Sequence, residues 1–126
     1  MTHFETPRVA IVGTGETGRG WAAVAVAAGW PVTIYDPDAE ALASAAEVIG
    51  DRVVHLVRLK RAETAVAEEA LNQMRVGRSL LHAVADAGWI IEALAEELQT
   101  KVKALQQMEQ VARQAAIITS SARGLG

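Results

Sequence analysis

The sequence contains no cysteine, few aromatic residues and only a small net charge. Without cysteine the chain cannot form disulfides, thiolate metal sites or a cysteine nucleophile, and we expect no metal site. A net charge of −3 provides no basic face for nucleic acid or for an anionic membrane. The longest apolar run, Trp21–Ala28, is too short to span a bilayer, and the polar segment Met1–Pro7 has no apolar signal core. We therefore expect a cytoplasmic protein with no nucleic-acid or membrane partner.

Small and β-branched apolar side chains are abundant. Hydrophobic residues make up 51% of the 126 residues and charged residues 21%, a balance typical of a folded globular protein. The length suits one domain, which we expect to span residues 1–126. Because Ala and Val dominate the apolar set and aromatic residues make up only 4%, helices packed on a β-branched sheet are favoured over a β-sandwich.

Short apolar runs alternate with helical patterns along the chain. Runs of this kind are typical of strands that are covered on both faces, as in a parallel sheet. The predicted strands are Val9–Val12, Val32–Tyr35, Met74–Val76, Trp89–Glu92 and Ala116–Thr119. The alternation predicts an α/β fold, a doubly wound parallel sheet of the Rossmann type with helices on both faces.

Helical segments separate these strands. Trp21–Ala28 is apolar all round, so we expect a buried helix that ends at Gly29. A long amphipathic helix follows from Asp38, and further helices are predicted at Glu63–Gln73 and Leu98–Val111. The apolar stripe of the long helix comprises Ala39, Leu42, Ala46, Ile49, Val53, Leu56 and Leu59. The second strand is thus followed by a long helical insertion.

A glycine-rich turn of the pattern GxGxxG follows the first strand: Gly13, Thr14, Gly15, Glu16, Thr17 and Gly18. The pattern is informative because a strand precedes it and a helix follows it. Gly13 allows a tight turn, Gly15 lets the backbone approach a pyrophosphate, and Gly18 lets the helix lie close to the sheet. The anion binds amides at the positive end of the helix dipole, where Glu16 would repel it if its side chain pointed inward. We predict that these six residues bind a dinucleotide.

A carboxylate, Asp36, ends the second predicted strand. A carboxylate at this distance from the glycine turn can accept hydrogen bonds from both adenosine ribose hydroxyls and repels a 2′-phosphate. No arginine follows to bind that phosphate, since the next residues are Pro37, Asp38 and Ala39. We therefore predict NAD rather than NADP as the cofactor. The alternative is that Asp36 only caps the helical region that follows.

Two segments together resemble a known family. Val9–Asp36 is similar to the amino-terminal NAD-binding domain of 3-hydroxyacyl-CoA dehydrogenases, whose strand, glycine turn, helix and strand read GxGxMGxGIA and end in YD. Ala85–Ala93 is similar to the family's ADADLVIEA segment, and the long helical insertion is also typical of the family. Gly20-Trp21-Ala22, and Ser120-Ser121 followed by Gly124-Leu125, resemble the branch of carnitine 3-dehydrogenases and their gulonate dehydrogenase relatives.

The resemblance implies hydride transfer between NAD and the carbinol carbon of a 3-hydroxy acid derivative, in fatty-acid metabolism for the acyl-CoA enzymes. It also implies that Glu96 and Lys101, which match a Glu and a Lys of the family, lie beside the nicotinamide end of the cofactor. Without the resemblance, Glu96 is an acidic residue at a helix start and Lys101 a solvated helix residue. The substrate stays open between an acyl-CoA, carnitine and a sugar acid.

The family's catalytic His–Glu pair follows a sixth strand, and we expect this chain to lack that region and the substrate domain. His3 lies in the tail, and His55 and His82 lie in predicted helices, so we assign no catalytic residue. The chain is expected to be inactive by itself, and a 3-hydroxy substrate would bind only with a second domain. It is then either a part of a full dehydrogenase or a stand-alone dinucleotide-binding module.

The last predicted strand raises two further points. Arg123 aligns without a gap to the family's substrate-contacting serine, whereas a three-residue slip would place Thr119-Ser120-Ser121 there, and both alignments stay open. Without a sixth strand, Ile117–Thr119 would form an apolar edge, which predicts a homo-oligomer.

Overall fold

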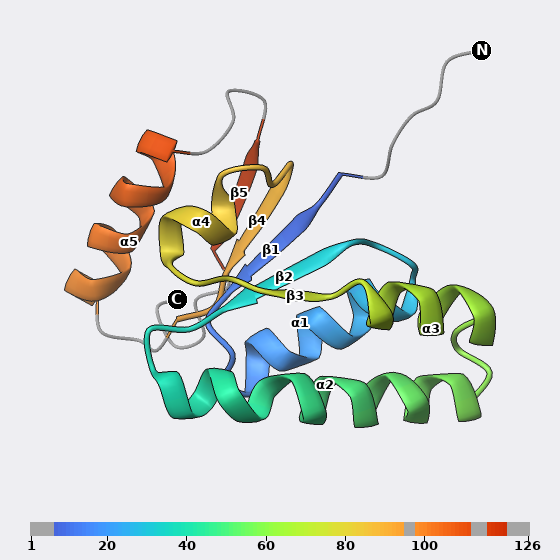
Figure 1. Ribbon diagram of the computed structural model, residues 1–126. Coiled ribbons are helices and arrows are strands. Elements are labelled where there is room, and N and C mark those ends of the chain that lie inside the picture. The colour runs from blue at the N-terminus through green and yellow to red at the C-terminus, as the bar shows by residue number, and fades with distance from the viewer. Residues whose placement is uncertain (1–6, 95–97, 112–115, 121–126) are drawn as a thin grey trace, which may run out of the picture.

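The computed structural model describes residues 7–94, 98–111 and 116–120. Their parallel strands form one sheet in the order β3-β2-β1-β4-β5 (Figure 1). The strands are β1 (Val9–Val12), β2 (Val32–Tyr35), β3 (Arg75–Val76), β4 (Trp89–Glu92) and β5 (Ile117–Ser120). The predicted parallel sheet is confirmed, with β3 one residue shorter and β5 one residue later than the sequence pattern indicates.

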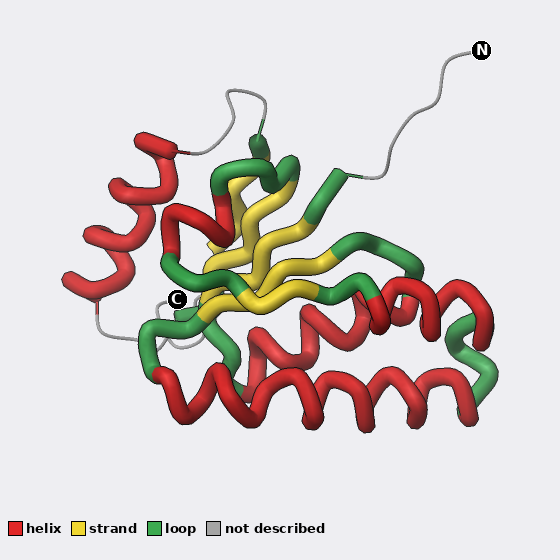
Figure 2. Tube along the Cα trace, viewed as in Figure 1, coloured by secondary structure: helices red, strands yellow, loops and turns green. Residues whose placement is uncertain are grey.

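Helices cover both faces of the sheet, as Figure 2 shows. One face is covered by α1 (Glu16–Ala27), α2 (Ala39–Arg58) and α3 (Thr64–Asn72), and the other by α4 (Leu80–Val84) and α5 (Leu98–Val111). α2 and α3 form the predicted helical insertion, and α4 supplies the helix expected around His82. Within the described residues, no helix is both long and apolar enough to cross a membrane.

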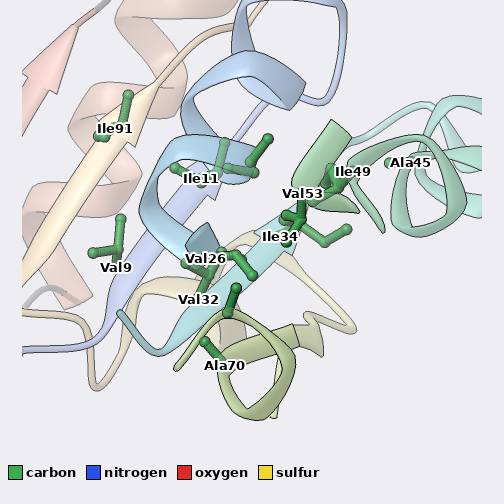
Figure 3. Close-up of a cluster of buried hydrophobic side chains, with 13 residues drawn as sticks. Val9, Ile11, Val26, Val32, Ile34, Ala45, Ile49, Val53, Ala70 and Ile91 are labelled. Carbon is green, nitrogen blue, oxygen red and sulfur yellow. The ribbon is translucent and has the colours of Figure 1, made fainter. Parts of the chain in front are cut away.

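β1 contributes side chains to two separate cores. Successive residues of a strand point to opposite faces, and all four residues of β1 are fully buried. Val9 and Ile11 pack with side chains of α1, α2 and α3, part of which Figure 3 shows. Ala10 and Val12 pack on the opposite face with side chains of α4 and α5. This two-sided burial explains the unbroken apolar run, since each Val or Ile stabilises the fold by roughly 1.5–3 kcal/mol when fully buried.

The end of α1 and the start of α2 are both capped, and the cap at Gly29 is the one that the sequence predicts. Gly29 has a φ of +92° and ends α1, with its amide donating to Val26 and the Trp30 amide donating to Ala25. This pair of bonds is the Schellman motif, which favours glycine at the left-handed position. α2 begins after Asp38, whose side chain accepts hydrogen bonds from the amides of Glu40 and Ala41.

The prediction of a fully buried first helix is wrong in part. α1 begins at Glu16, directly after the glycine turn, and Trp21 and Val24 are 43% and 57% exposed. These two side chains line an apolar groove together with Trp89 and Ile91 of β4. No described element covers this groove. An apolar run specifies a helix, but it does not specify which of its faces find a neighbour.

The stripe predicted for α2 also needs correction. Its buried residues are Ala45, Ile49 and Val53, so Ala45 takes the place expected for Ala46, which is half-buried. The terminal members of the stripe, Ala39 and Leu59, are exposed because the ends of α2 extend beyond the sheet and α1.

Candidate functional site

The candidate site lies at the carboxyl edge of the sheet, where the strand order reverses between β1 and β4. The Gly13 amide donates to the Tyr35 carbonyl at 2.7 Å, and the Ala93 amide donates to the Val12 carbonyl at 2.7 Å. The exits of β2 and β4 therefore flank the glycine turn. In open parallel sheets, ligands bind in the crevice outside the carboxyl ends of the strands at such a reversal.

Close packing requires two of the three glycines. Gly13 has a φ of +108°, and a Cβ there would collide with the carbonyl oxygen of Ala93. A Cβ on Gly18 would collide with the carbonyl oxygen of Gly13. The turn is thus held between the exit of β4 and the first turn of α1. These are the turning and packing roles that the sequence pattern predicts for Gly13 and Gly18.

Gly15 has different surroundings. It is exposed, and no atom lies within 4 Å of the position that its Cβ would occupy. Gly15 is the N-cap of α1, and as a glycine it has no side chain that could cap the helix. The first amides of a helix have no acceptor within the helix, and they mark the positive end of its dipole. The open space at Gly15 therefore gives an anion access to the amino end of α1.

Asp36 is hydrogen-bonded to the glycine turn. Its Oδ2 accepts from the Thr14 amide at 2.7 Å and from the Thr14 hydroxyl at 3.1 Å. Its Oδ1 accepts from the Asp38 amide at 2.8 Å, so Asp36 also contacts the start of the α2 region. A carboxylate oxygen offers about two acceptor positions, so Oδ1 retains one for a further donor. The sequence predicted a carboxylate here but not its contact with Thr14.

Glu16 forms ion pairs with two arginines. Its carboxylate lies 3.0 Å from Arg52 of α2 and 3.7 Å from Arg19, and its side chain is 69% exposed. The Arg19 guanidinium also donates to the Gly15 carbonyl at 3.3 Å. Exposed ion pairs stabilise a fold by only about 0–1 kcal/mol. Their main consequence is that positive charge compensates the carboxylate beside the anion-accessible end of α1.

A cavity of about 280 Å³ adjoins Asp36 on the face covered by α4 and α5. Tyr35 and Pro37, the two neighbours of Asp36, form one side, and Leu94 and Ala104 form another. The lining residues come from separate segments of the chain, so sequence patterns alone could not reveal the cavity. Most of its lining residues are apolar, with Lys103 and Gln107 as polar members, a combination that suits a flat aromatic ring with polar edges.

The remaining predicted residues are placed only in part. Thr17 lies in the first turn of α1 and is half-buried. Lys101 lies in α5, but its side chain is outside the described part of the chain, as are Glu96, Arg123 and His3 in full. His55 and His82 are exposed on α2 and α4.

Comparison with known proteins identifies the family. The family described as 3-hydroxyacyl-CoA dehydrogenase, NAD binding domain, matches residues 8–126. The chain belongs to this NAD-binding domain family. It is 35% identical over 117 residues to an L-carnitine dehydrogenase of Streptomyces griseus, covering 93% of this chain and 34% of that protein. It is 32% identical over 113 residues to the 3-hydroxyadipyl-CoA dehydrogenase of Escherichia coli, covering 90% of this chain and 24% of that protein. The chain therefore spans about a third or less of these relatives.

Solved structures of similar proteins have the same fold. A 3-hydroxybutyryl-CoA dehydrogenase from Escherichia coli matches with a TM-score of 0.80 and 29% identity, over 94% of this chain and 25% of that chain. A diketoreductase matches with a TM-score of 0.81 and 28% identity, over 95% of this chain and 43% of that chain. The predicted Rossmann-type fold and the predicted NAD cofactor agree with these findings.

Proposed function

We propose that the crevice between Gly15, α1 and Asp36 is where this family member binds NAD. The pyrophosphate lies against Gly15 and accepts hydrogen bonds from the first amides of α1, those of Glu16 and Thr17. Gly13 and Gly18 shape the turn and do not contact the dinucleotide. The observation that supports this most directly is the open space at Gly15, the N-cap of α1.

Asp36 binds one hydroxyl of the adenosine ribose through its remaining acceptor position, since its other three positions accept from Thr14 and Asp38. Thr14 is 2% exposed and donates both its amide and its hydroxyl to Asp36, so it positions the carboxylate rather than the phosphate. A negative carboxylate at this place disfavours the 2′-phosphate of NADP. The adenine ring occupies the cavity lined by Tyr35, Pro37 and Leu94, because Tyr35 and Pro37 are the chain neighbours of Asp36.

The nicotinamide half extends from the pyrophosphate toward the exits of β4 and β5. Glu96 and Lys101 contact it there, which is the role that family resemblance implies for them. In the oxidoreductase, hydride passes between the nicotinamide and the carbinol carbon of a 3-hydroxy acid derivative. The named activities of the relatives make an acyl-CoA and carnitine the first candidates for that substrate, with a sugar acid as a further alternative.

These 126 residues form the dinucleotide-binding domain of the enzyme that carries out this reaction. We assign none of their side chains a catalytic role. Turnover then requires a second domain with a proton donor for the alkoxide that forms on reduction. A non-catalytic dinucleotide-binding module is the second candidate, and it predicts the same NAD site. A role in fatty-acid metabolism and a cytoplasmic location belong to the same proposal.

The chain also forms a homo-oligomer in this proposal. β5 is the edge strand of the described sheet, and Ile117 on it is 64% exposed. An exposed apolar edge strand is a template for pairing with a second chain.

Calorimetric titration of the chain with NAD, with 3-hydroxybutyryl-CoA and L-carnitine turnover assayed in parallel, tests the proposal. We expect one saturable NAD site and no turnover by this chain alone. A folded chain without an NAD site would overturn the proposed site, and turnover by the chain alone would overturn the assignment of no catalytic residue.

A further inference from the structure

A buried carboxylate lies at the centre of the carboxyl edge. Glu92, the last residue of β4, is 0% exposed and lies in register between Val12 of β1 and Ser120 of β5. Its Oε2 accepts a hydrogen bond from the Leu94 amide at 2.6 Å, and its Oε1 accepts one from the Ser120 hydroxyl at 2.6 Å. Burying a carboxylate is costly unless its oxygens are hydrogen-bonded. An apolar residue would fill this end of the strand at lower cost, so the carboxylate calls for a reason beyond packing.

Two hydrogen bonds that Glu92 forms with described residues fix the exits of two strands. Leu94 directly follows Ala93, whose carbonyl packs against Gly13. Ser120 is the last residue of β5, and its hydroxyl joins that strand's exit to β4. A single buried side chain therefore holds the exits of β4 and β5 in one arrangement beside the glycine turn.

The strand order decides which half of the ligand meets these exits. In the proposed function the adenosine lies at β2, beside Asp36, and the pyrophosphate lies at the amino end of α1. The remainder of the dinucleotide then crosses the reversal between β1 and β4 and extends toward β4 and β5. Of the two partners of Glu92, Leu94 lines the proposed adenine cavity, whereas Ser120 does not line it and lies farther along the sheet, on β5.

We propose that Glu92 is a positioning residue whose hydrogen bond to Ser120 holds the exit of β5 in place for the nicotinamide half of NAD. This inference rests on the proposed function and deepens it. Glu92 does not contact the reacting atoms in this account, and it acts through Ser120. Removal of the Ser120 hydroxyl should therefore weaken binding of the whole dinucleotide and leave binding of its adenosine diphosphate half unchanged.

The test compares NADH with ADP on the full chain, using Ser120→Ala, Glu92→Gln and the double variant. We expect Ser120→Ala to weaken NADH binding about fivefold to tenfold and ADP binding less than about twofold. Ser120→Thr is the matched control, because it keeps the hydroxyl, and it should retain most of the NADH affinity. In the Glu92→Gln background, Ser120→Ala should weaken NADH binding less than it does in the wild-type chain, because a neutral amide makes a weaker hydrogen bond to the hydroxyl than a carboxylate does.

Thermal melting of each variant separates folding from binding, and Ser120→Ala alone decides the question if Glu92→Gln does not fold. Equal losses for NADH and ADP, no loss of either, or a Ser120→Thr variant as weak as Ser120→Ala would overturn the positioning role. A wild-type chain that binds neither ligand would overturn the proposed function and this inference with it. A wild-type chain that binds both, with an NADH affinity insensitive to Ser120, would overturn this inference alone.

Discussion

The amide and the hydroxyl of Thr14 both donate hydrogen bonds to Oδ2 of Asp36, at 2.7 Å and 3.1 Å. The contact joins the glycine turn after β1 to the exit of β2, so the carboxylate has a fixed position before a ligand arrives. Fixing a binding group in advance reduces the conformational entropy lost on binding. The affinity and the cofactor preference of the site should therefore depend strongly on this one side chain.

Replacing Asp36 should change the cofactor preference. Asp36→Ala removes the acceptor for a ribose hydroxyl and the charge that opposes a 2′-phosphate. We expect NADH binding to weaken at least about tenfold and NADPH binding to change much less. Titration of both cofactors measures the ratio. Asp38→Ala is the control, because it removes a neighbouring carboxylate that caps α2 and does not contact the turn. Equal losses for NADH and NADPH in Asp36→Ala would contradict the ribose assignment.

Gly15 and Gly18 should respond in opposite ways to the same substitution. Gly15→Ala introduces a methyl group into open space, so the free energy of unfolding should change by less than about 1 kcal/mol while NADH binding weakens at least about tenfold. Gly18→Ala forces a collision with the Gly13 carbonyl and should destabilise the fold by roughly 3 kcal/mol. Denaturant unfolding and NADH titration of both variants check this. Full NADH affinity in a folded Gly15→Ala variant would place the pyrophosphate elsewhere.

The ion pair between Glu16 and Arg52 should affect binding more than stability. Arg52→Ala leaves the Glu16 carboxylate less compensated beside the phosphate site, so we expect NADH affinity to fall about threefold at low salt and less at high salt. The free energy of unfolding should change by less than about 0.5 kcal/mol. Glu16→Gln in the Arg52→Ala background should restore the affinity. A failure of that second change to restore it would show that Arg52 acts on the ligand directly.

Filling the cavity beside Asp36 should block the adenine. Gln107 lines the cavity from α5, and Gln106 is an exposed neighbour on the same helix that does not line it. We expect Gln107→Trp to weaken AMP binding about fivefold and Gln106→Trp to leave it unchanged. Calorimetry with AMP measures both. Equal affinities in the two variants would exclude this cavity as the adenine site.

The exposed edge strand should govern self-association. Ile117→Lys places a charge on β5, and charged residues on an edge strand oppose pairing with a second chain. We expect the wild-type chain to elute as an oligomer in gel filtration at high concentration, and Ile117→Lys to elute as a monomer. A wild-type chain that stays monomeric at high concentration would contradict the homo-oligomer.

The parts of the fold that are encoded locally could be predicted from the sequence. The two strands Val9–Val12 and Val32–Tyr35 lie close together in the chain, with the glycine turn and α1 between them. Their apolar runs and the glycines specify strand and turn without information from distant residues. The turn type at Gly13 follows from the same local pattern, because only glycine readily adopts its φ of +108°.

The rest depends on which distant segments become neighbours. Burial is expected for Trp21 and Val24, yet both are exposed, because no described element covers the groove that they form with Trp89 and Ile91 of β4. The contacts of Glu92 with Ser120 and of Arg52 with Glu16 depend on register and helix placement across long stretches of chain. The sequence does mark Glu92 as unusual, because it is a charged residue at the end of the apolar run of β4. The pattern alone did not identify its partner.

The central claim is that this chain has a dinucleotide site selective for NAD. The most direct measurement is a fluorescence titration with NADH beside NADPH, with energy transfer from Trp21, Trp30 and Trp89 to the bound nicotinamide as the signal. We predict saturable binding of NADH at a concentration at least about tenfold lower than for NADPH. Absence of NADH binding by a folded sample, or equal affinity for the two cofactors, would contradict the account.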